Sequence, residues 1–409
     1  MKKLIALLLA VMMVFALCAC GAQTAAPAAE EEAPAEDAAP AEEAAEEAPA
    51  EEAAAEAAGT FALGVSGPLT GGAAVYGNAV ANGAQIAVDE INALGGIQFT
   101  VEAQDDEADG EKAINAYNTL LDDGMQVLVG PVTSGAGIAV AAQAYADRVF
   151  CLTPSGSSTD VIDGNDNMFQ VCFTDPNQGK ASADYMAENF AGCKVAVIYR
   201  NDDAYSQGIH DSFVAECAEV GVEVVDDETF TDATSTDFSV QLTAAQAAGA
   251  DMIFLPIYYT PASVILKQAA DMGYEPTFFG VDGMDGILTL EGFDTALAEG
   301  VMLLTPFSAD AADDLTQNFV AKYQEAYGEV PNQFAADAYD AVYIIKAAIE
   351  AAGCTADMSP EDICEALIPV MTELSVDGVT GAGMTWDASG AVSKGPMAVV
   401  IKDGVYVTP

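Results

Sequence analysis

The sequence predicts an α/β fold of two doubly wound lobes, each a parallel sheet with helices on both faces. Short apolar runs of strand length alternate with longer runs whose apolar residues recur at helical spacing. This alternation repeats from Thr60 onward, as expected for strand–helix–strand units. The 409 residues exceed the usual size of one compact core, and 52% of them are apolar. The chain is therefore long and apolar enough for two cores.

Regular units begin at Thr60. The run Thr60–Val65 predicts a strand, and apolar residues from Val80 to Ile91 mark one face of a helix that ends at Gly95-Gly96. The first lobe then continues with three strands, at Phe99–Ala103, Gln126–Gly130 and Val149–Thr153. The second lobe has four predicted strands, at Lys194–Tyr199, Val222–Val225, Met252–Leu255 and Thr277–Gly280. Its helices are expected near Gln207–Val220, Ser239–Ala248 and Ala262–Met272.

Ligands of open parallel sheets bind outside the carboxyl ends of the strands. Three loops at such ends are small and rich in hydroxyl groups, at 67–72, 130–135 and 153–158. Hydroxyls and N–H groups at helix starts can hold a carboxylate without a basic side chain. Each loop taken singly also fits an ordinary turn with a capping serine. Three of them at strand ends favour a binding site.

Residues 1–20 read as an export signal, with Lys2 and Lys3 before an apolar run that is short for a membrane span. An uncleaved anchor is the alternative. The sequence Leu17-Cys18-Ala19-Cys20, followed by glycine, resembles the bacterial lipobox. That resemblance implies a signal peptide at 1–19 and a lipidated Cys20. The mature chain is then expected on the outer face of the cytoplasmic membrane, or on the periplasmic side if an outer membrane is present.

The segment 22–58 is almost entirely Ala, Glu and Pro, with twelve acids and no base. It cannot bury enough apolar surface to offset the entropy of ordering, so we expect a disordered tether over 20–59. Subtracting these acids and the two signal lysines from the chain's 64 acids and 12 bases leaves 52 and 10, a charge of −42. Such an acidic domain does not bind nucleic acid through a basic surface.

The residues that catalysis usually needs are scarce. The chain has one histidine, His210, and no GxSxG, HExxH, GxxxxGK[ST] or GxGxxG motif. The run Asp105, Asp106, Glu107 and Asp109 resembles a cation loop but lacks EF-hand spacing, so a structural role is favoured over metal binding. We therefore predict a protein that is not an enzyme and has no cofactor.

Six cysteines follow Cys20, an even number that permits disulfides outside the cell. Cys354 and Cys364 are ten residues apart across a loop with Gly, Ser and Pro, which makes them the most plausible bridge. Cys193 and Cys217 fit buried apolar positions equally well. With no CxxC motif, the sequence offers little support for a metal or thioredoxin-like site.

Several segments together resemble the leucine/isoleucine/valine-type substrate-binding proteins of ABC importers. They include TFALGVSGPLTGGAAVYG, VLVGPVTSGAG, LTPSGSSTD, YRNDDAYSQG, FFGVDGM and GMTWDASGAVSKGPMAVVIKDG, in that order. The resemblance implies the type I periplasmic-binding fold, in which two lobes joined by three crossings close over a ligand. We place the crossings near Phe173–Asn177, Thr305–Ser308 and Gly383–Trp386. Lobe I then comprises 60–175 plus 306–383, and lobe II 176–305 plus 384–409.

The same resemblance implies a pocket for an amino acid. Ser134 matches the serine that binds the ligand's carboxylate, Ser155 a position whose carbonyl meets the ammonium, and Ser157 a threonine that contacts both. Asp282 matches an acid that pairs with the ammonium, where relatives often have the longer glutamate. The aromatic residues that wall the pocket are matched by Tyr76, Tyr205 and Tyr258. Trp386 and His210 are expected to be structural, with His210 on an exposed helix. Asp202 and Asp203 either add negative charge near the cleft or belong to a solvated loop.

The function predicted from these observations is that of an anchored, monomeric binding protein. It would capture a small amino acid, branched-chain or similarly aliphatic, and deliver it to an ABC permease. One alternative is the same fold binding a short amide, urea or an aromatic acid. The others are a ligand-sensing receptor and an enzyme with a serine nucleophile.

Overall fold

The computed structural model describes residues 59–409. The predicted signal peptide, the lipidation site Cys20 and the acidic tether therefore lie outside the described residues. Among the described helices, none combines the length and apolar character that crossing a membrane requires.

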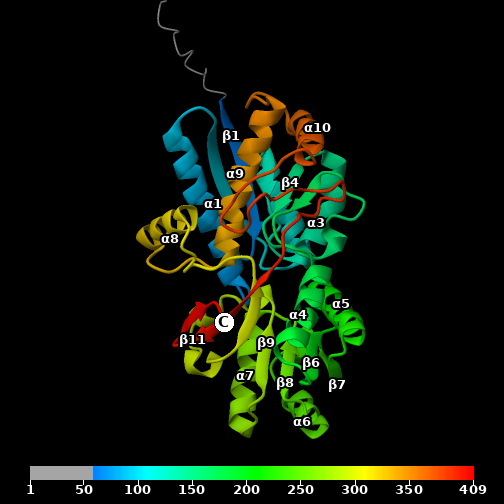
Figure 1. Ribbon diagram of the computed structural model, residues 1–409. Coiled ribbons are helices and arrows are strands. Elements are labelled where there is room, and N and C mark those ends of the chain that lie inside the picture. Colours follow the sequence, from blue (N-terminus) through cyan, green and yellow to red (C-terminus); the bar gives the residue numbers. More distant parts are fainter. Residues whose placement is uncertain (1–58) are drawn as a thin grey trace, which may run out of the picture. The chain divides into compact units, whose positions relative to one another are not determined.

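The first sheet has five parallel strands in the order β2-β1-β3-β4-β5 (Figure 1). The β1 and β3 strands pair in register, with Leu63 opposite Val127. We call the part of the chain built on this sheet lobe I. Its strands are β1 (Thr60–Gly67), β2 (Gln98–Asp105), β3 (Val127–Val129), β4 (Phe150–Thr153) and β5 (Met168–Gln170).

Helices cover both faces of this sheet, because alternate residues of its buried strands pack into different cores. Val127 and Val129 face the core under α1 (Ala74–Leu94) and α9 (Gln333–Ala352), whereas Leu128 faces the one under α2 (Gly110–Asp122) and α3 (Ser134–Asp147). A Cβ on Gly83 of α1 would lie 2.0 Å from the Ala335 carbonyl oxygen, so these two helices touch backbone to backbone only with glycine there. The lobe also carries α8 (Asp314–Tyr327) and α10 (Pro360–Met371).

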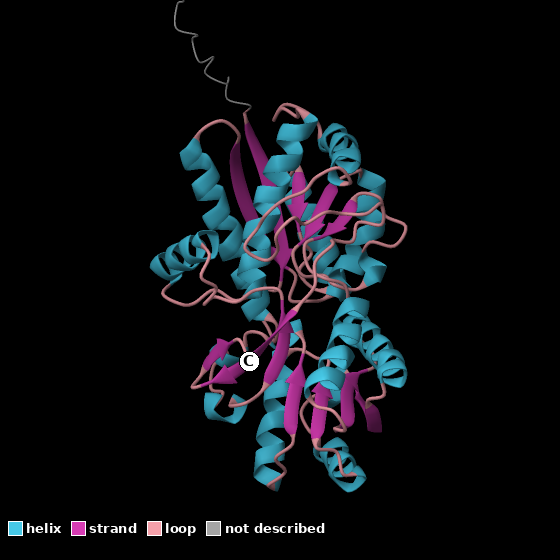
Figure 2. Cartoon of the chain, in the orientation of Figure 1, coloured by secondary structure: helices cyan, strands magenta, loops and turns pink. Residues whose placement is uncertain are grey.

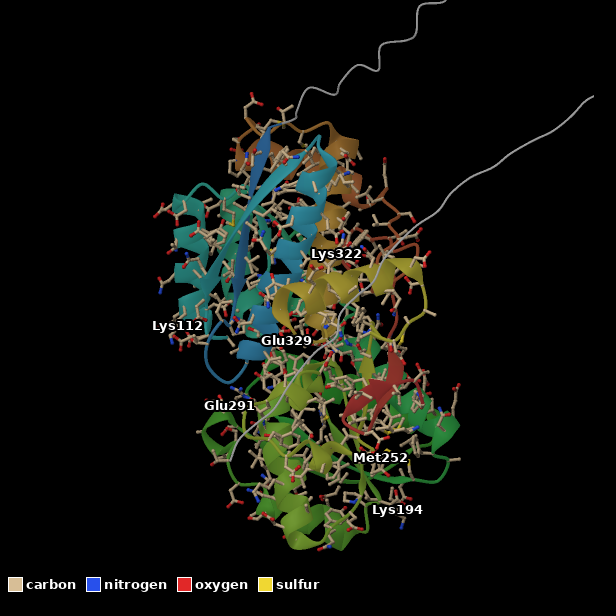
Figure 3. The ribbon with its side chains drawn as sticks, turned by 90° about the vertical axis from the view of Figure 1, so that its left-hand side faces the viewer. Lys112, Lys194, Met252, Glu291, Lys322 and Glu329 are labelled. Carbon is tan, nitrogen blue, oxygen red and sulfur yellow. The ribbon has the colours of Figure 1, made fainter. Side chains whose placement is uncertain are left out.

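The second sheet has seven strands in the order β12-β11-β10-β9-β8-β6-β7, and we call its part of the chain lobe II. Figure 3 shows Lys194 and Met252, the first residues of neighbouring β6 and β8, at the same end of this sheet, as parallel pairing requires. The pairs β10–β11 and β11–β12 are antiparallel. The strands are β6 (Lys194–Arg200), β7 (Glu223–Phe230), β8 (Met252–Leu255), β9 (Thr277–Gly280), β10 (Met302–Thr305), β11 (Met397–Lys402) and β12 (Val405–Val407).

Helices cover both faces of the lobe II sheet (Figure 2), and a separate core lies on each face. Val195 and Val197 of β6 pack under α4 (Asp175–Asn189) and α5 (Ala204–Val220). Ala196 and Ile198 of the same strand join the core under α6 (Ser239–Ala248) and α7 (Tyr259–Met272). The predicted fold class, two doubly wound parallel lobes, is thus confirmed, with an antiparallel edge in lobe II that the sequence analysis did not predict.

The chain passes between the lobes three times. The first passage lies between β5 and α4 and the second between β10 and α8, at the two places predicted. The third comes later than the predicted Gly383–Trp386. The Trp386 indole N–H donates to the Gln170 carbonyl oxygen at 2.7 Å, and the Gln170 N–H donates to the Gly390 carbonyl oxygen at 2.9 Å. These bonds to β5 hold residues 384–390 on lobe I, so the chain leaves for β11 only after them.

A buried ion pair lies just before this third passage. The Lys394 ammonium is 2.6 Å from Asp337 Oδ1 and 2.7 Å from the Thr380 hydroxyl, with side-chain exposures of 4% for Lys394 and 2% for Asp337. Asp340 accepts hydrogen bonds from the Val379 N–H and from both the N–H and the hydroxyl of Thr380. We call Asp337, Asp340, Thr380 and Lys394 the hinge cluster.

The predicted bridge between Cys354 and Cys364 is wrong for this structure, in which the six cysteines of the described residues are all free thiols. Cys354 follows Gly353, the residue that ends α9. Cys364 lies on the buried face of α10, which packs on β4 and brings this thiol near Cys151 of that strand. Both cysteines are buried in the core of lobe I as free thiols.

Candidate functional site

The three predicted serines lie together at the carboxyl ends of β3 and β4, and all three are buried. Ser134, the first residue of α3, accepts a hydrogen bond from the Ser158 N–H at 3.1 Å. The Ser155 hydroxyl donates to the Val132 carbonyl oxygen at 2.7 Å, which ties one loop to the other. The Ser157 hydroxyl oxygen has no hydrogen-bond partner within the described chain. Lobe I thus presents a hydroxyl-lined surface on which two buried hydroxyls, those of Ser157 and Thr133, have no partner among the described residues.

The three predicted tyrosines also meet, although they come from different lobes. Tyr76 of α1 contacts Tyr258 edge to face, with ring centroids 5.3 Å apart, and Tyr205 of α5 lies 5.0 Å from Tyr258. The Tyr76 hydroxyl donates to the Gly283 carbonyl oxygen in lobe II. Phe334 at the start of α9 adds a fourth ring, 4.3 Å from Tyr76. These rings form an aromatic wall across the junction of the lobes.

Asp282 opens a short 3₁₀ helix, η3 (Asp282–Met284), that follows β9, and only 4% of it is exposed. Its Oδ1 accepts hydrogen bonds from the Tyr205 hydroxyl at 2.6 Å and from the Gly283 N–H at 2.7 Å. Burial raises the pKa of Asp282 to about 6, although these two hydrogen bonds act in the opposite direction. The carboxyl group is thus held in place, and no base of the described residues 59–409 forms an ion pair with it.

The sequence analysis missed two polar residues on α4 that belong to this site. Asp175 is 1% exposed, and neither of its carboxyl oxygens has a hydrogen-bond partner among the described residues. Gln178, one helical turn later, accepts from the Asp282 N–H at 3.3 Å, while its own amide nitrogen is unpaired there. We call Ser157, Asp175, Gln178, Tyr205 and Asp282 the cleft cluster. Asp175 could have been singled out from the sequence, because it is an acidic residue within a predicted crossing and at the start of a helix.

Negative charge dominates the surroundings of Asp175. Burial is the main cause that raises its pKa well above the usual range, and the carboxylates of Asp282 and Asp203 add to it. The nearby Ser157 hydroxyl acts in the opposite direction, but it does not meet the geometry of a hydrogen bond. Unpaired buried polar atoms are rare and costly in folded proteins. Several of them around one point indicate where a ligand's polar groups belong.

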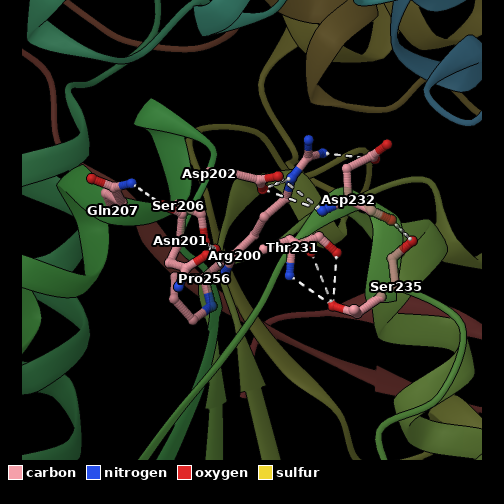
Figure 4. A network of polar contacts seen from close by, with 10 residues as sticks. Arg200, Asn201, Asp202, Ser206, Gln207, Thr231, Asp232, Ser235 and Pro256 are labelled. Atoms are coloured by element: carbon pink, nitrogen blue, oxygen red, sulfur yellow. Dashed lines mark hydrogen bonds and ion pairs between the residues drawn. The ribbon is translucent and has the colours of Figure 1, made fainter.

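The base nearest to Asp203 is engaged elsewhere. Arg200 lies 2.7 Å from Asp202 and 3.3 Å from Asp232, as Figure 4 shows. The Ser206 hydroxyl in the same network donates to the Pro256 carbonyl oxygen and accepts from the Arg200 N–H. Of the two acids considered in the sequence analysis, Asp202 therefore pairs with arginine. Asp203 lies close to the aromatic wall. Burial is the main cause of the raised pKa of Tyr258, and the Asp203 carboxylate adds to it.

Two other candidates have structural contacts. Asp105 accepts hydrogen bonds from the Leu69 N–H and the Thr70 hydroxyl, and Asp109 caps the start of α2. We expected His210 to be exposed, but it is buried, with only 8% of its surface exposed. Its ring stacks on that of Tyr199, with ring centroids 3.7 Å apart. Its Nδ1 lies 2.8 Å from Asp211 and its Nε2 3.1 Å from Asp227. The acidic neighbours replace water as partners for both ring nitrogens, which explains the burial.

A cavity of about 760 Å³ lies elsewhere, on the flank of the junction between the lobes. None of the seven predicted ligand-binding residues lines it. The chemistry of the cleft cluster is the stronger guide to the ligand site, because its unpaired polar atoms have lost water without gaining partners. The residues of the cleft cluster come from both lobes and are all buried, and the flank cavity is a separate feature.

The chain is similar to known binding proteins over nearly all of its described length. Residues 60–404 match the family described as periplasmic binding protein. The Leu/Ile/Val-binding protein BraC3 of Rhizobium johnstonii is 31% identical over 299 residues, which cover 72% of this chain and 80% of that protein. The leucine-, isoleucine-, valine-, threonine- and alanine-binding protein of Pseudomonas aeruginosa is 28% identical over 76% of this chain and 83% of its own length.

Solved structures give the same picture. A leucine-binding protein from Thermotoga maritima has a TM-score of 0.77 at 28% identity, over 85% of this chain and 97% of that one. The branched-chain amino acid transporter substrate-binding protein of Streptococcus pneumoniae, solved in complex with isoleucine, has a TM-score of 0.76 at 29% identity, over 86% of this chain and 100% of that one. A benzoate complex from R. palustris, with a TM-score of 0.75 at 21% identity over 85% and 95%, shares the fold.

Proposed function

Because the chain belongs to the periplasmic binding protein family of non-enzymatic transport components, we propose that it captures a small amino acid between its two lobes and delivers it to an ABC permease. A branched-chain or similarly aliphatic amino acid is the proposed ligand. Relatives named for leucine, isoleucine and valine support this choice, as does the wall of tyrosine and phenylalanine rings. An apolar wall beside a few placed polar groups is the usual character of a small-molecule site.

The unpaired polar atoms of the cleft cluster carry this proposal. A zwitterion brings one ammonium group, which needs buried carboxylates, and one carboxylate, which needs hydroxyls and helix N–H groups. Asp282 and Asp175 offer the first, both buried without a base. For the carboxylate, Ser157 offers a hydroxyl that is free among the described residues, and Ser134 lies at the start of α3, where helix N–H groups are available. In this assignment the two ends of the ligand contact different lobes.

Contacts between the lobes support a closing mechanism. The Thr260 hydroxyl of lobe II donates to the Gly72 carbonyl oxygen of lobe I at 2.6 Å, and the Gln333 N–H donates to Asp285 Oδ2 at 3.0 Å. A ligand that contacts both lobes shifts the open–closed equilibrium by its greater affinity for the closed state. The energy of closing then comes from satisfying Ser157, Asp175 and Asp282.

The same charges weigh against the alternative ligands. An aromatic acid or a neutral amide brings no cation for Asp175 and Asp282, so both buried carboxyl groups would stay without a counter-ion, and Asp175 without any hydrogen-bond partner, or would have to take up protons. A ligand-sensing receptor would need the same pocket, and the ligand alone does not separate that role from transport. Transport is favoured by the relatives named as transporter binding proteins.

A ligand screen followed by calorimetry tests the proposal. The twenty amino acids are screened by thermal shift, and the best one is titrated in its free and its N-acetylated form. We expect an aliphatic amino acid to stabilise the protein by roughly 3–4 kcal/mol at 100 to 1,000 times its dissociation constant. Acetylation removes the ammonium charge and should abolish binding. Equal affinity for both forms, or tighter binding of benzoate or urea, would contradict the amino-acid assignment.

The proposal also includes a lipid anchor at Cys20, carried by the lipobox resemblance. The anchored domain would work as a monomer close to its permease. Intact-mass measurement of the native protein, compared with Cys20→Ala, tests the anchor. A mature chain that begins at Cys20 with added lipid mass supports it, and an unmodified N-terminus overturns it.

A further inference from the structure

The flank cavity differs from the cleft cluster in position and in chemistry. Its walls come from α1, α8, the 285–289 turn, the second crossing and the β11–β12 hairpin, so both lobes contribute. Figure 3 shows Glu329, one of its lining residues, beneath α8. Its volume of about 760 Å³ is typical of small-molecule sites, which span roughly 300–1,000 Å³.

The charged residues that line the flank cavity are all acids. They are Asp285, Asp310 and Glu329, and within the part of the chain that the structure describes no lysine, arginine or histidine lines the cavity. Lys322 of α8, labelled near Glu329 in Figure 3, is paired instead with Glu90 at 2.8 Å. The Asp310 carboxylate accepts a hydrogen bond from the Ser308 hydroxyl. A cation in the cavity would therefore meet acids and no competing base.

Asp285 is the most buried of these acids, with 5% exposure. Its Oδ2 accepts the Gln333 N–H, while its Oδ1 has no hydrogen-bond partner among the described residues. Burial raises the pKa of its carboxyl group, whereas the Gln333 N–H and the nearby Tyr406 hydroxyl act in the opposite direction. A buried carboxylate without a cation is costly, and a cationic group from a ligand would offset that cost.

Apolar and aromatic groups form the rest of the lining. Phe307, Tyr323 and Tyr406 contribute rings, whose faces attract organic cations. Val330 and Val405 also line the cavity although they are 54% and 55% exposed, which places large apolar side chains in water. Exposed apolar side chains around a concavity mark a surface that something covers.

We propose that the flank cavity is a second binding site, for a small organic cation with an apolar body, and that Asp285 is its counter-ion. The aromatic and valine side chains would hold the apolar body. This site is separate from the amino-acid site and does not depend on it. Since residues of both lobes and of the second crossing line the cavity, its occupant would also bias how far the lobes close.

Three probes of similar size and shape test the charge requirement. Calorimetry compares 3-phenylpropylammonium, the neutral 3-phenylpropan-1-ol and the anionic 3-phenylpropionate on the full chain. We expect the ammonium probe to bind about tenfold more tightly than the alcohol, and the anion not to bind. The proposal would be overturned if the ammonium and alcohol probes bound with equal affinity. It would also be overturned if the ammonium probe showed no saturable binding up to about 10 mM.

Two variants locate the binding. Asp285→Asn should lower the affinity for the ammonium probe by about tenfold and leave that for the alcohol unchanged. Thr289→Arg places a cation at the exposed rim of the cavity, so it should have the same effect even if the buried substitution impairs folding. Glu291→Gln removes an exposed acid that does not line the cavity and is the matched control. If Asp285→Asn and Thr289→Arg both bind the ammonium probe like the parent, the cavity is not its site.

Discussion

Two clusters of buried carboxylates lie at the junction of the lobes, and they differ in one respect. In the hinge cluster, Asp337 has the Lys394 ammonium 2.6 Å away. In the cleft cluster, Asp175 and Asp282 have no base beside them, and both oxygens of Asp175 are unpaired among the described residues. Burial raises the pKa of all three carboxyl groups, but Lys394 counteracts this only at Asp337.

The presence or absence of a cation beside the buried carboxylate distinguishes a structural role from a ligand-binding role. A buried carboxylate with its own cation holds chain segments together, here the third passage between the lobes. A buried carboxylate without one weakens the empty protein and strengthens the complex with a cationic ligand. Removing a partner should therefore cost stability in the hinge cluster and affinity in the cleft cluster.

The largest expected effect is on the hinge cluster. Lys394→Met keeps the apolar stem but leaves Asp337 buried without a cation, which should lower the free energy of unfolding by about 3–5 kcal/mol. Urea denaturation measures it. Lys267→Met, which breaks an exposed pair with Asp271, is the control and should change stability by about 0.5 kcal/mol or less. Similar losses in both variants would remove the distinction between buried and exposed pairs.

The second effect is on ligand affinity. Asp282→Asn keeps the shape of the side chain and removes its charge, so binding of the best amino acid should weaken by about 2–5 kcal/mol, with no loss of stability in the empty protein. Calorimetric titration and denaturation measure the two quantities. Asp105→Asn, in the acidic run with structural contacts, is the control for affinity. Binding within about threefold of the parent would show that Asp282 does not meet the ammonium.

A pH series sharpens the same comparison. The pKa of Asp282 rises from its ordinary 3.8 to about 6 on folding, so the folded state binds the proton more tightly than the unfolded state. This stabilisation is present below pH 3.8 and is lost as the pH rises through about 6. The free energy of unfolding of the ligand-free parent, measured relative to that of Asp282→Asn, should fall by about 3 kcal/mol between about pH 3.5 and about pH 7. Affinity for the amino acid should rise over the same interval, and a parallel fall would contradict the assignment.

The smallest effect concerns closure. Tyr76→Phe removes the hydroxyl that donates to the Gly283 carbonyl oxygen across the lobes, so the closed state should lose about 1 kcal/mol. Small-angle scattering without ligand should show larger average dimensions, and saturating ligand should restore those of the parent. Tyr327→Phe, on the exposed end of α8, is the control. Dimensions like those of the parent without ligand would show that this contact does not hold the lobes.

The strands and helices were predictable because each carries its own periodic signal. Val127 and Val129 sit in a continuous apolar run, as a strand buried on both faces requires, and the helices have clear glycine ends. The third passage between the lobes was misplaced because bonds from Trp386 and Gly390 to β5, far away in the sequence, decide it. The antiparallel pairing of β11 with β12 was not predicted, because the alternation of residues along a strand does not indicate the direction of its neighbour.

Of the candidate site, the periodic pattern predicted only the hydroxyl-rich loops at the strand ends, and the resemblance to a known family supplied the individual residues. The serines follow strands whose carboxyl ends share one edge of a sheet, and Tyr205 and Asp282 lie at the matching edge of lobe II. Asp175 was missed, and His210 was wrongly expected to be exposed, because their burial depends on contacts that are distant in the sequence. His210 is buried only because Asp227 of β7 and the ring of Tyr199 cover it.

The bond from Trp386 to Gln170 also has an optical consequence. Trp386 is the chain's only tryptophan, 3% exposed, on the segment that precedes the third passage. Fluorescence excited selectively in tryptophan therefore comes from one indole at a known place beside the hinge. The protein carries a built-in reporter, and ligand-induced changes in its emission would follow the hinge without any attached dye.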